Sequence, residues 1–144
     1  MMAKEILKKN SSANVQRLGH VAIRVKDIER AKSFYVGLGM NLVWDDNDWC
    51  YLEAGSGKDG LALLGPGYKA AGPHFAFHFT DRTQVEAIHR QLNLQGIQVG
   101  KLHDHRDGTA SFYLKDPEGN WLEMLYQPSN GISSNHLFEQ HLLE

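Results

Sequence analysis

The sequence predicts a single α+β domain built from two βαβββ units that form a cupped, barrel-like sheet, with short tails at both ends. An internal repeat is the first observation behind this prediction. Segments 19–27 (GHVAIRVKD) and 73–81 (PHFAFHFTD) match at an offset of 54, with histidine, alanine and aspartate aligned. The second observation is that each segment alternates as a strand does and then continues with helical periodicity. The third is that each copy closes with a further apolar strand pattern, at 61–64 and 121–125.

The first unit begins with a strand in which Val21, Ile23 and Val25 alternate with shorter or polar side chains. Asp27 is placed to cap a helix, which glycines at 37 and 39 end. Strands are predicted at 41–44, 49–54 and 61–64, with a glycine-rich turn before the last of them.

The second unit repeats this order. Alternating phenylalanines predict a strand at 75–79, and Asp81 or Thr83 is placed to cap a helix that Gly96 ends. A strand at 97–99 and a polar loop at 101–109 follow. Strands at 111–114 and 121–125 are joined by the turn DPEGN at 116–120.

These elements set the expected domain boundaries. Residues 1–16 are polar and without a clear period, and we expect an N-terminal tail there. The domain is expected at 17–128, with units at 17–68 and 72–128. Residues 129–144 are expected to form a linker and a short C-terminal helix.

Composition restricts the class of function. A formal net charge of −2 and a pI near 6.4 give no electrostatic reason to expect nucleic acid or an anionic membrane as partner. No apolar run approaches the length of a membrane span, and the N-terminal residues lack the apolar centre of a secretory signal. Cys50, a single cysteine, excludes an intrachain disulfide. We expect a cytoplasmic protein that binds a small molecule.

Two histidines and one glutamate form the candidate chemical site. His20 and His74 begin the equivalent strands of the two repeats, and Glu123 interrupts an apolar strand. A buried carboxylate needs a partner, and a divalent cation is a natural one. The alternative is structural: the histidines pack in the core, and Glu123 pairs with Arg24. His78, on the same strand face as His74, either supports such a metal site or packs in the core.

The segments LGHVAIRVKDIERAKSFYVGLGM, PHFAFHF and SFYLKDPEGNWLEML resemble the vicinal oxygen chelate superfamily, over about residues 17–128. This group includes glyoxalase I, fosfomycin-modifying enzymes, extradiol dioxygenases, methylmalonyl-CoA epimerase and metal-free bleomycin-binding proteins. The resemblance implies that His20, His74 and Glu123 bind one divalent ion. Fe²⁺, Mn²⁺, Ni²⁺ and Zn²⁺ all suit this ligand set.

Departures from the family pattern indicate a subgroup. Glyoxalase I and the epimerase use a fourth protein ligand, which the repeat alignment places at Leu63, a residue that cannot bind metal. Three-ligand members, the fosfomycin enzymes and extradiol dioxygenases, carry a tyrosine ten residues before the glutamate, as Tyr113 is here. The resemblance therefore implies that Tyr113 is catalytic, through a hydrogen bond or proton given to a metal-bound oxyanion.

Neither three-ligand subgroup fits fully. Lys101, Ser111 and Tyr113 resemble the fosfomycin transferases, but Ala22 replaces their threonine, and 126–134 lacks their arginine. The dioxygenases carry an extra histidine before the second ligand, and none lies between His20 and His74. The loop histidines His103 and His105 are candidates to replace it. The full set of expected substrate-binding residues is Trp49, Lys101, His103, His105, Ser111 and Trp121.

The resulting hypothesis is a metal-dependent lyase or dioxygenase that binds a small substrate through two adjacent oxygens. A non-catalytic binding protein of the bleomycin-resistance kind is one alternative, and a fosfomycin-modifying enzyme is another. An orphan protein with a structural metal is a third. Units of this type expose sheet edges, so a homodimer is also expected.

Overall fold

The computed structural model describes residues 14–105 and 108–128. Most of the predicted N-terminal tail (1–13) and the predicted C-terminal linker and helix (129–144) lie outside the described residues. Within them the chain forms two helices and one eight-stranded mixed sheet, in the order β2-β3-β4-β1-β5-β8-β7-β6. Along the described chain, no helix combines the length and apolarity that crossing a membrane would require.

The first unit has the predicted order of elements. The side chain of Asp27 accepts a hydrogen bond from the Arg30 amide at 3.1 Å and so starts the helix. Gly39, at φ +110°, follows its end, where a left-handed backbone favours glycine. The elements are β1 (Arg17–Arg24), α2 (Ile28–Gly37), β2 (Asn41–Asp45), β3 (Trp49–Ala54) and β4 (Asp59–Leu64).

The second unit follows the same plan with one difference. Asp81 caps its helix by accepting from the Thr83 amide at 2.9 Å. The elements are β5 (His74–Phe79), α3 (Arg82–Leu94), β6 (His103–Asp104), β7 (Ala110–Lys115) and β8 (Trp121–Tyr126).

The predicted strand at 97–99 is wrong. Only Val99 makes an isolated bridge, to Leu114, and the two-residue strand β6 forms instead inside the predicted loop. Gly100 lies against β7, where its amide donates to the Tyr113 carbonyl at 2.8 Å. A Cβ at Gly100 would come within 3.2 Å of that carbonyl, so the chain approaches β7 at this point without continuing the ladder.

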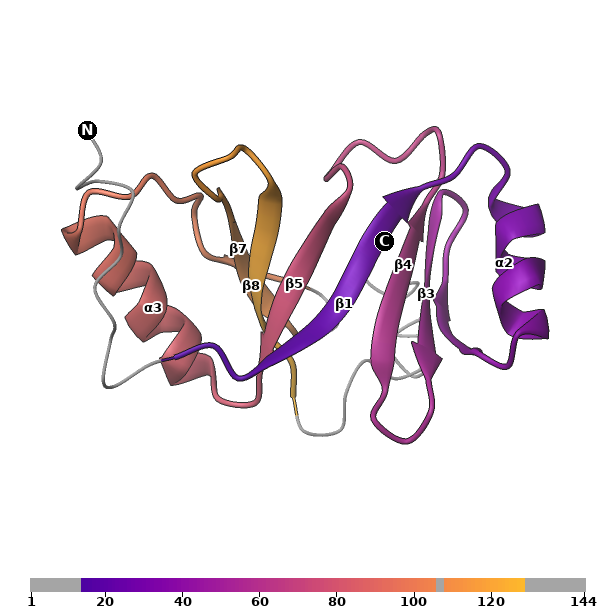
Figure 1. The fold of residues 1–144 in the computed structure, drawn as a ribbon, viewed down its shortest axis with the longest axis horizontal. Helices are drawn as coiled ribbons and strands as arrows, with labels where there is room; N and C mark the ends of the chain where they lie inside the picture. The colour runs from indigo at the N-terminus through magenta and orange to yellow at the C-terminus, as the bar shows by residue number, and fades with distance from the viewer. Residues whose placement is uncertain (1–13, 106–107, 129–144) are drawn as a thin grey trace.

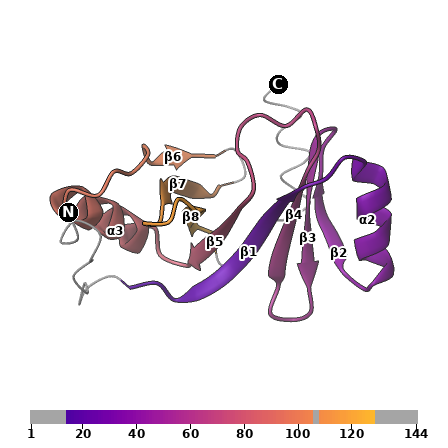
Figure 2. The same cartoon turned by 45° about the horizontal axis from the view of Figure 1, so that its top comes forward.

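The two units are arranged symmetrically about the centre of the sheet. β1 and β5 pair antiparallel there, while β4 runs parallel to β1 and β8 runs parallel to β5. Figure 1 shows α2 at one end of the assembly and α3 at the other, with β1 and β5 between them. Figure 2 shows the same arrangement turned forward, with β6 beside β7. The predicted fold class is confirmed, and the sheet is open, because it ends at β2 and β6.

Each unit packs an apolar core under its helix. In the first unit Leu52 and Leu63 pack with residues of α2, and in the second Val85 and Ile88 of α3 pack on Phe112. Because strand side chains alternate between faces, the residues next to these in sequence point to the opposite face of the sheet. That face carries the candidate site.

Candidate metal centre

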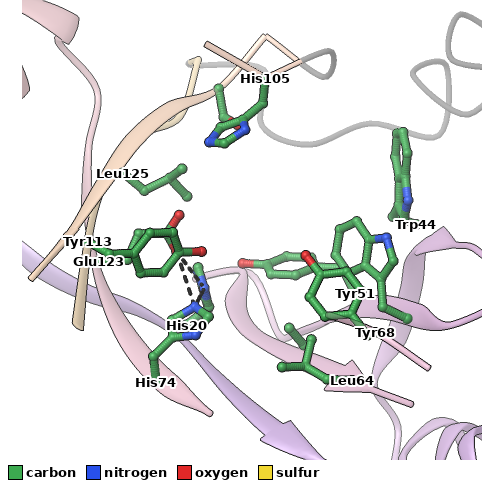
Figure 3. Close-up of a pocket in the computed structure, with 13 residues that line it drawn as sticks. His20, Trp44, Tyr51, Leu64, Tyr68, His74, His105, Tyr113, Glu123 and Leu125 are labelled. Atoms are coloured by element: carbon green, nitrogen blue, oxygen red, sulfur yellow. Dashed lines mark hydrogen bonds and ion pairs between the residues drawn. The ribbon is translucent and has the colours of Figure 1, made fainter. Parts of the chain in front are cut away.

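His20, His74 and Glu123 converge on the face of the sheet away from the helices (Figure 3). Glu123 Oε1 lies 3.3 Å from Nε2 of each histidine, and the two Nε2 atoms are 3.4 Å apart. The candidate ligand atoms all lie within 4.8 Å of one another. The three residues therefore could hold one metal ion.

Strand pairing explains this convergence. His20 on β1 is opposite Ala76 on β5, and Ala76 is opposite Glu123 on β8. His74 lies two residues before Ala76 and so points to the same face. Ala76 is fully buried, and its small side chain lets the longer side chains of the two neighbouring strands meet above it.

The charges fit a cation site. Burial works to raise the pKa of Glu123, but hydrogen bonds with His20 and His74 outweigh it and hold that pKa well below its usual range. Glu123 is therefore an ionised carboxylate with only 5% of its surface exposed. For His74, burial works to lower the pKa, but the contact with Glu123 and the Gly72 carbonyl raises it. A buried anion between two imidazoles is the donor set that divalent transition metals bind.

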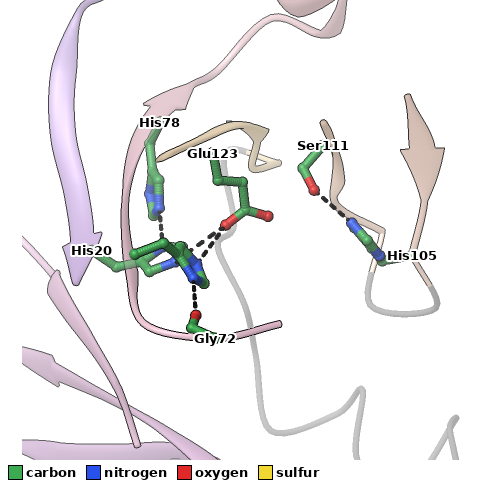
Figure 4. Close-up of polar contacts among 7 residues, drawn as sticks. His20, Gly72, His78, His105, Ser111 and Glu123 are labelled. Carbon is green, nitrogen blue, oxygen red and sulfur yellow. Dashed lines mark hydrogen bonds and ion pairs between the residues drawn. The ribbon is translucent and has the colours of Figure 1, made fainter. Parts of the chain in front are cut away.

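The other ring nitrogen of each histidine has a partner (Figure 4). His74 Nδ1 donates to the Gly72 carbonyl at 2.7 Å, and His20 Nδ1 lies 2.7 Å from His78 Nε2. Burial, followed by the neighbouring His20 and Arg17, lowers the pKa of His78 to about 3, so this imidazole is neutral. Both candidate ligands are thus fixed with Nε2 toward Glu123.

A cavity of about 250 Å³ opens above this triad. The triad and polar residues of the second unit line one side, and aromatic and aliphatic residues of the first unit line the other. Among the described residues, no lysine or arginine contributes to the lining. Besides the triad, the lining consists of Trp44, Trp49, Tyr51, Ala62, Leu64, Tyr68, His105, Thr109, Tyr113 and Leu125.

Tyr113 points into the cavity beside the triad (Figure 3). Its ring meets that of His74 edge to face, with centroids 5.1 Å apart. Burial, followed by the negative charge of Glu123, raises the pKa of Tyr113 far above that of a free phenol. Tyr113 therefore keeps its proton and can donate a hydrogen bond to an oxygen bound next to Glu123.

Ser111 connects the loop histidine His105 to the triad. His105 Nε2 lies 2.8 Å from Ser111 Oγ, and Ser111 also helps to lower the pKa of Glu123. A serine hydroxyl can donate and accept, so Ser111 can pair with the His105 ring in either tautomer. His105 lines the cavity, whereas Ser111 is buried beneath it.

Of the remaining expected substrate-binding residues, two line a cavity and two do not. Trp49 lies in the cavity wall, where it stacks on Trp44 at 6.0 Å. Trp121 is outside that cavity and half exposed; it lines a second cavity, of about 280 Å³, with His74 and Tyr113. Lys101 and His103 are exposed, and the described lining of neither cavity includes them.

The prediction that Leu63 occupies the position of a fourth ligand was wrong by one residue. Ala22 pairs with Ala62 as Ala76 pairs with Glu123, so Ala62 and not Leu63 is equivalent to Glu123. Leu63 is fully buried on the opposite face with Cys50 and Leu52. A shift of one residue turns a strand side chain to the other face. Alanine cannot bind metal either, so the described residues still offer three ligands at this site.

Sequence reasoning also missed most of the aromatic wall. Tyr51 pairs with Ala62 as Tyr113 pairs with Glu123, so the repeat carried a signal for Tyr51. For Trp44 and Tyr68 the sequence carried no signal beyond the size of their side chains. The alternative partner for Glu123 is not used, because Arg24 donates to the carbonyls of Gly65 and Tyr68, at 2.7 and 2.9 Å.

Comparison with known proteins identifies the family. The model of the Glyoxalase/Bleomycin resistance protein/Dioxygenase superfamily matches residues 17–124, three quarters of the chain. The protein belongs to this superfamily.

Individual relatives are distant. Glutathione transferase FosA of Serratia marcescens is 26% identical over 76% of this chain and 80% of its own length. Biphenyl-2,3-diol 1,2-dioxygenase 3 of Rhodococcus globerulus is 27% identical over 75% of this chain, but only 62% of its own length is covered. Methylmalonyl-CoA epimerase of Mycobacterium tuberculosis has the same fold, with a TM-score of 0.67 at 21% identity over 88% of this chain and 95% of its own.

Proposed function

We propose that the protein is a metal-dependent enzyme that binds a small substrate through two adjacent oxygens. The observation that carries the proposal is the buried set of His20, His74 and Glu123 at the floor of a cavity. The ion, one per chain, would be Fe²⁺, Mn²⁺, Ni²⁺ or Zn²⁺. When bound, it would supply positive charge that holds the substrate oxygens and stabilises an oxyanion.

The protein's own residues supply orientation and a proton. Tyr113, kept protonated by its surroundings, would donate to the substrate oxygen nearest Glu123. Ser111 pairs with His105 at 2.8 Å, so the imidazole of His105 would stay beside the same cavity. The aromatic wall of Trp44, Trp49 and Tyr68 would receive the apolar part of the substrate and exclude water.

Among reaction types, we favour a dioxygenase or a lyase. Ala22 in place of the threonine of the fosfomycin transferases, together with the lack of an arginine in the sequence at 126–134, argues against a fosfomycin-modifying enzyme. The retained ligand set argues against the non-catalytic binding alternative, since the bleomycin-binding proteins that the sequence resembles typically lack it.

Metal analysis of protein purified without chelator tests the proposal, together with activity screens on a catechol and on a hemithioacetal. We expect one divalent ion per chain, lost in His74→Ala. His89→Ala is the matched control, because His89 lies on α3 and contacts the Gly100 carbonyl, away from the triad. Full metal retention in His74→Ala would overturn the site.

A further inference from the structure

The two candidate ligand histidines are held by partners of different kinds. His74 Nδ1 donates to a backbone carbonyl, which can only accept. His20 Nδ1 faces His78 Nε2 at 2.7 Å, and a neutral imidazole nitrogen either accepts or donates, according to which nitrogen carries the proton. Which ring nitrogen of His20 carries the proton therefore depends on His78.

We propose that His78 is a positioning residue that selects the metal-binding tautomer of His20. The inference rests on the proposed metal site, because a metal binds the lone pair of His20 Nε2 only when the proton sits on Nδ1. His78 Nε2 stabilises that tautomer by accepting the Nδ1 proton. Outer hydrogen-bond partners of this kind orient metal-binding histidines generally.

Packing around His78 supports a specific role for the contact. His78 is 3% exposed, and its ring meets that of His20 at a centroid distance of 4.9 Å. Gly19, next to His20, makes room for it. A Cβ at Gly19 would come within 1.9 Å of His78 Cγ and within 2.2 Å of two further ring atoms. The glycine before the first ligand is therefore required for His78 to reach His20. Figure 4 shows this contact between the two imidazoles.

A second set of contacts holds the other side of the His20 ring. Tyr51 meets it edge to face, at 5.6 Å between centroids, and the Tyr51 hydroxyl packs over Gly60, where a Cβ would lie 1.9 Å from it. Tyr51 fixes the ring plane but leaves the tautomer open, since His20 Nδ1 faces His78. Tautomer selection is thus separable from packing.

Two measurements on three variants test the inference. His78→Leu removes the acceptor, His78→Gln restores one, and Gly19→Ala displaces the ring. We expect His78→Leu and Gly19→Ala to bind Zn²⁺ about 10–100-fold more weakly than the parent. His78→Gln should recover most of the affinity. His89→Leu is the control for losing a histidine contact away from the triad, and should bind as the parent does.

Nitrogen NMR of the metal-free proteins gives a readout that a packing role would not move. In the parent, the proton of His20 should reside on Nδ1; in His78→Leu both tautomers should be populated. An unchanged tautomer and unchanged Zn²⁺ affinity in His78→Leu would overturn the inference. Retention of metal by His74→Ala would instead overturn the proposed site, so the two failures are distinguishable.

Discussion

At the scale of single residues, one position separates this site from a four-ligand site. Ala62 stands where Glu123 stands in the other unit, and both side chains border the cavity. The second unit alone supplies a carboxylate, so the cavity is polar on one side and apolar on the other. Neighbouring Leu63, although adjacent in sequence, belongs to the core under α2.

Ala62→Glu should create a fourth ligand. In the metal-free protein the added carboxylate would be buried without a partner, at a cost of about 2–4 kcal/mol of unfolding free energy. Added Zn²⁺ should restore stability by more than it does in the parent, while native activity falls because a coordination position is lost. Melting temperatures with and without Zn²⁺ check this. Leu63→Glu is the contrast, and we expect equal destabilisation in both conditions; metal rescue there would contradict the register.

Tyr113→Phe should separate chemistry from metal binding. The variant keeps the ring against His74 and removes only the hydroxyl, so metal content should be unchanged. If Tyr113 donates a proton or hydrogen bond during the reaction, kcat should fall by about 10²–10⁴. Steady-state kinetics with metal analysis measures both. Tyr35→Phe, in the core under α2, is the control, and equal activity of the two variants would contradict the role.

At the scale of elements, the segment between the units is held by one side chain. Arg24, at the end of β1, donates to the carbonyls of Gly65, Tyr68 and Ala71. That segment carries Tyr68 into the cavity wall and ends at Gly72, whose carbonyl accepts from His74. The end of the first strand therefore fixes the approach to the second ligand.

Arg24→Ala should loosen this segment. We expect a loss of about 1–3 kcal/mol in unfolding free energy, from carbonyls left without their charged donor. Zn²⁺ affinity should also fall, because the backbone before His74 is less fixed. Urea unfolding and calorimetric titration measure the two effects. Arg24→Lys, which keeps the charge but lacks the forked donor, should recover only part of each; complete recovery would show that charge alone suffices.

Elements also mark the limit of what the sequence could predict. The helix caps Asp27 and Asp81 are local signals and lie where they were predicted. The repeat of His20 at His74 is a periodic signal; His74 begins β5 as predicted, but His20 lies inside β1, which starts at Arg17. Ala62 was missed because the strand at 61–64 is apolar throughout, so its sequence does not distinguish between two alignments that differ by one residue. The segment 97–105 was misread because Gly100 and the pairing of β6 depend on contacts with the following strand, β7, and the polar sequence of this segment does not show those contacts. Trp44 and Tyr68 gather at the cavity only through tertiary packing.

At the scale of the whole molecule, apolar side chains remain exposed at one end. Phe34 on α2 and Leu38, the residue that caps its end, have 62% and 68% of their surfaces exposed, and Leu42 on β2 is 40% exposed. β2 is also a terminal strand of an open sheet. An apolar group beside an unpaired edge is typical of a surface that another chain covers.

We therefore predict a homodimer that uses this end of the molecule. Sedimentation velocity should give twice the chain mass of 16.2 kDa, with a twofold interface in which each copy presents the same surface. Leu38→Glu should weaken the dimer, because a charge inside an apolar contact must be desolvated without a partner. Leu94→Glu is the matched control: Leu94 is 77% exposed at the end of α3, in the other unit. A parent protein that sediments as a monomer at high concentration would contradict the dimer. Equal dissociation by both variants would contradict its placement on α2 and β2.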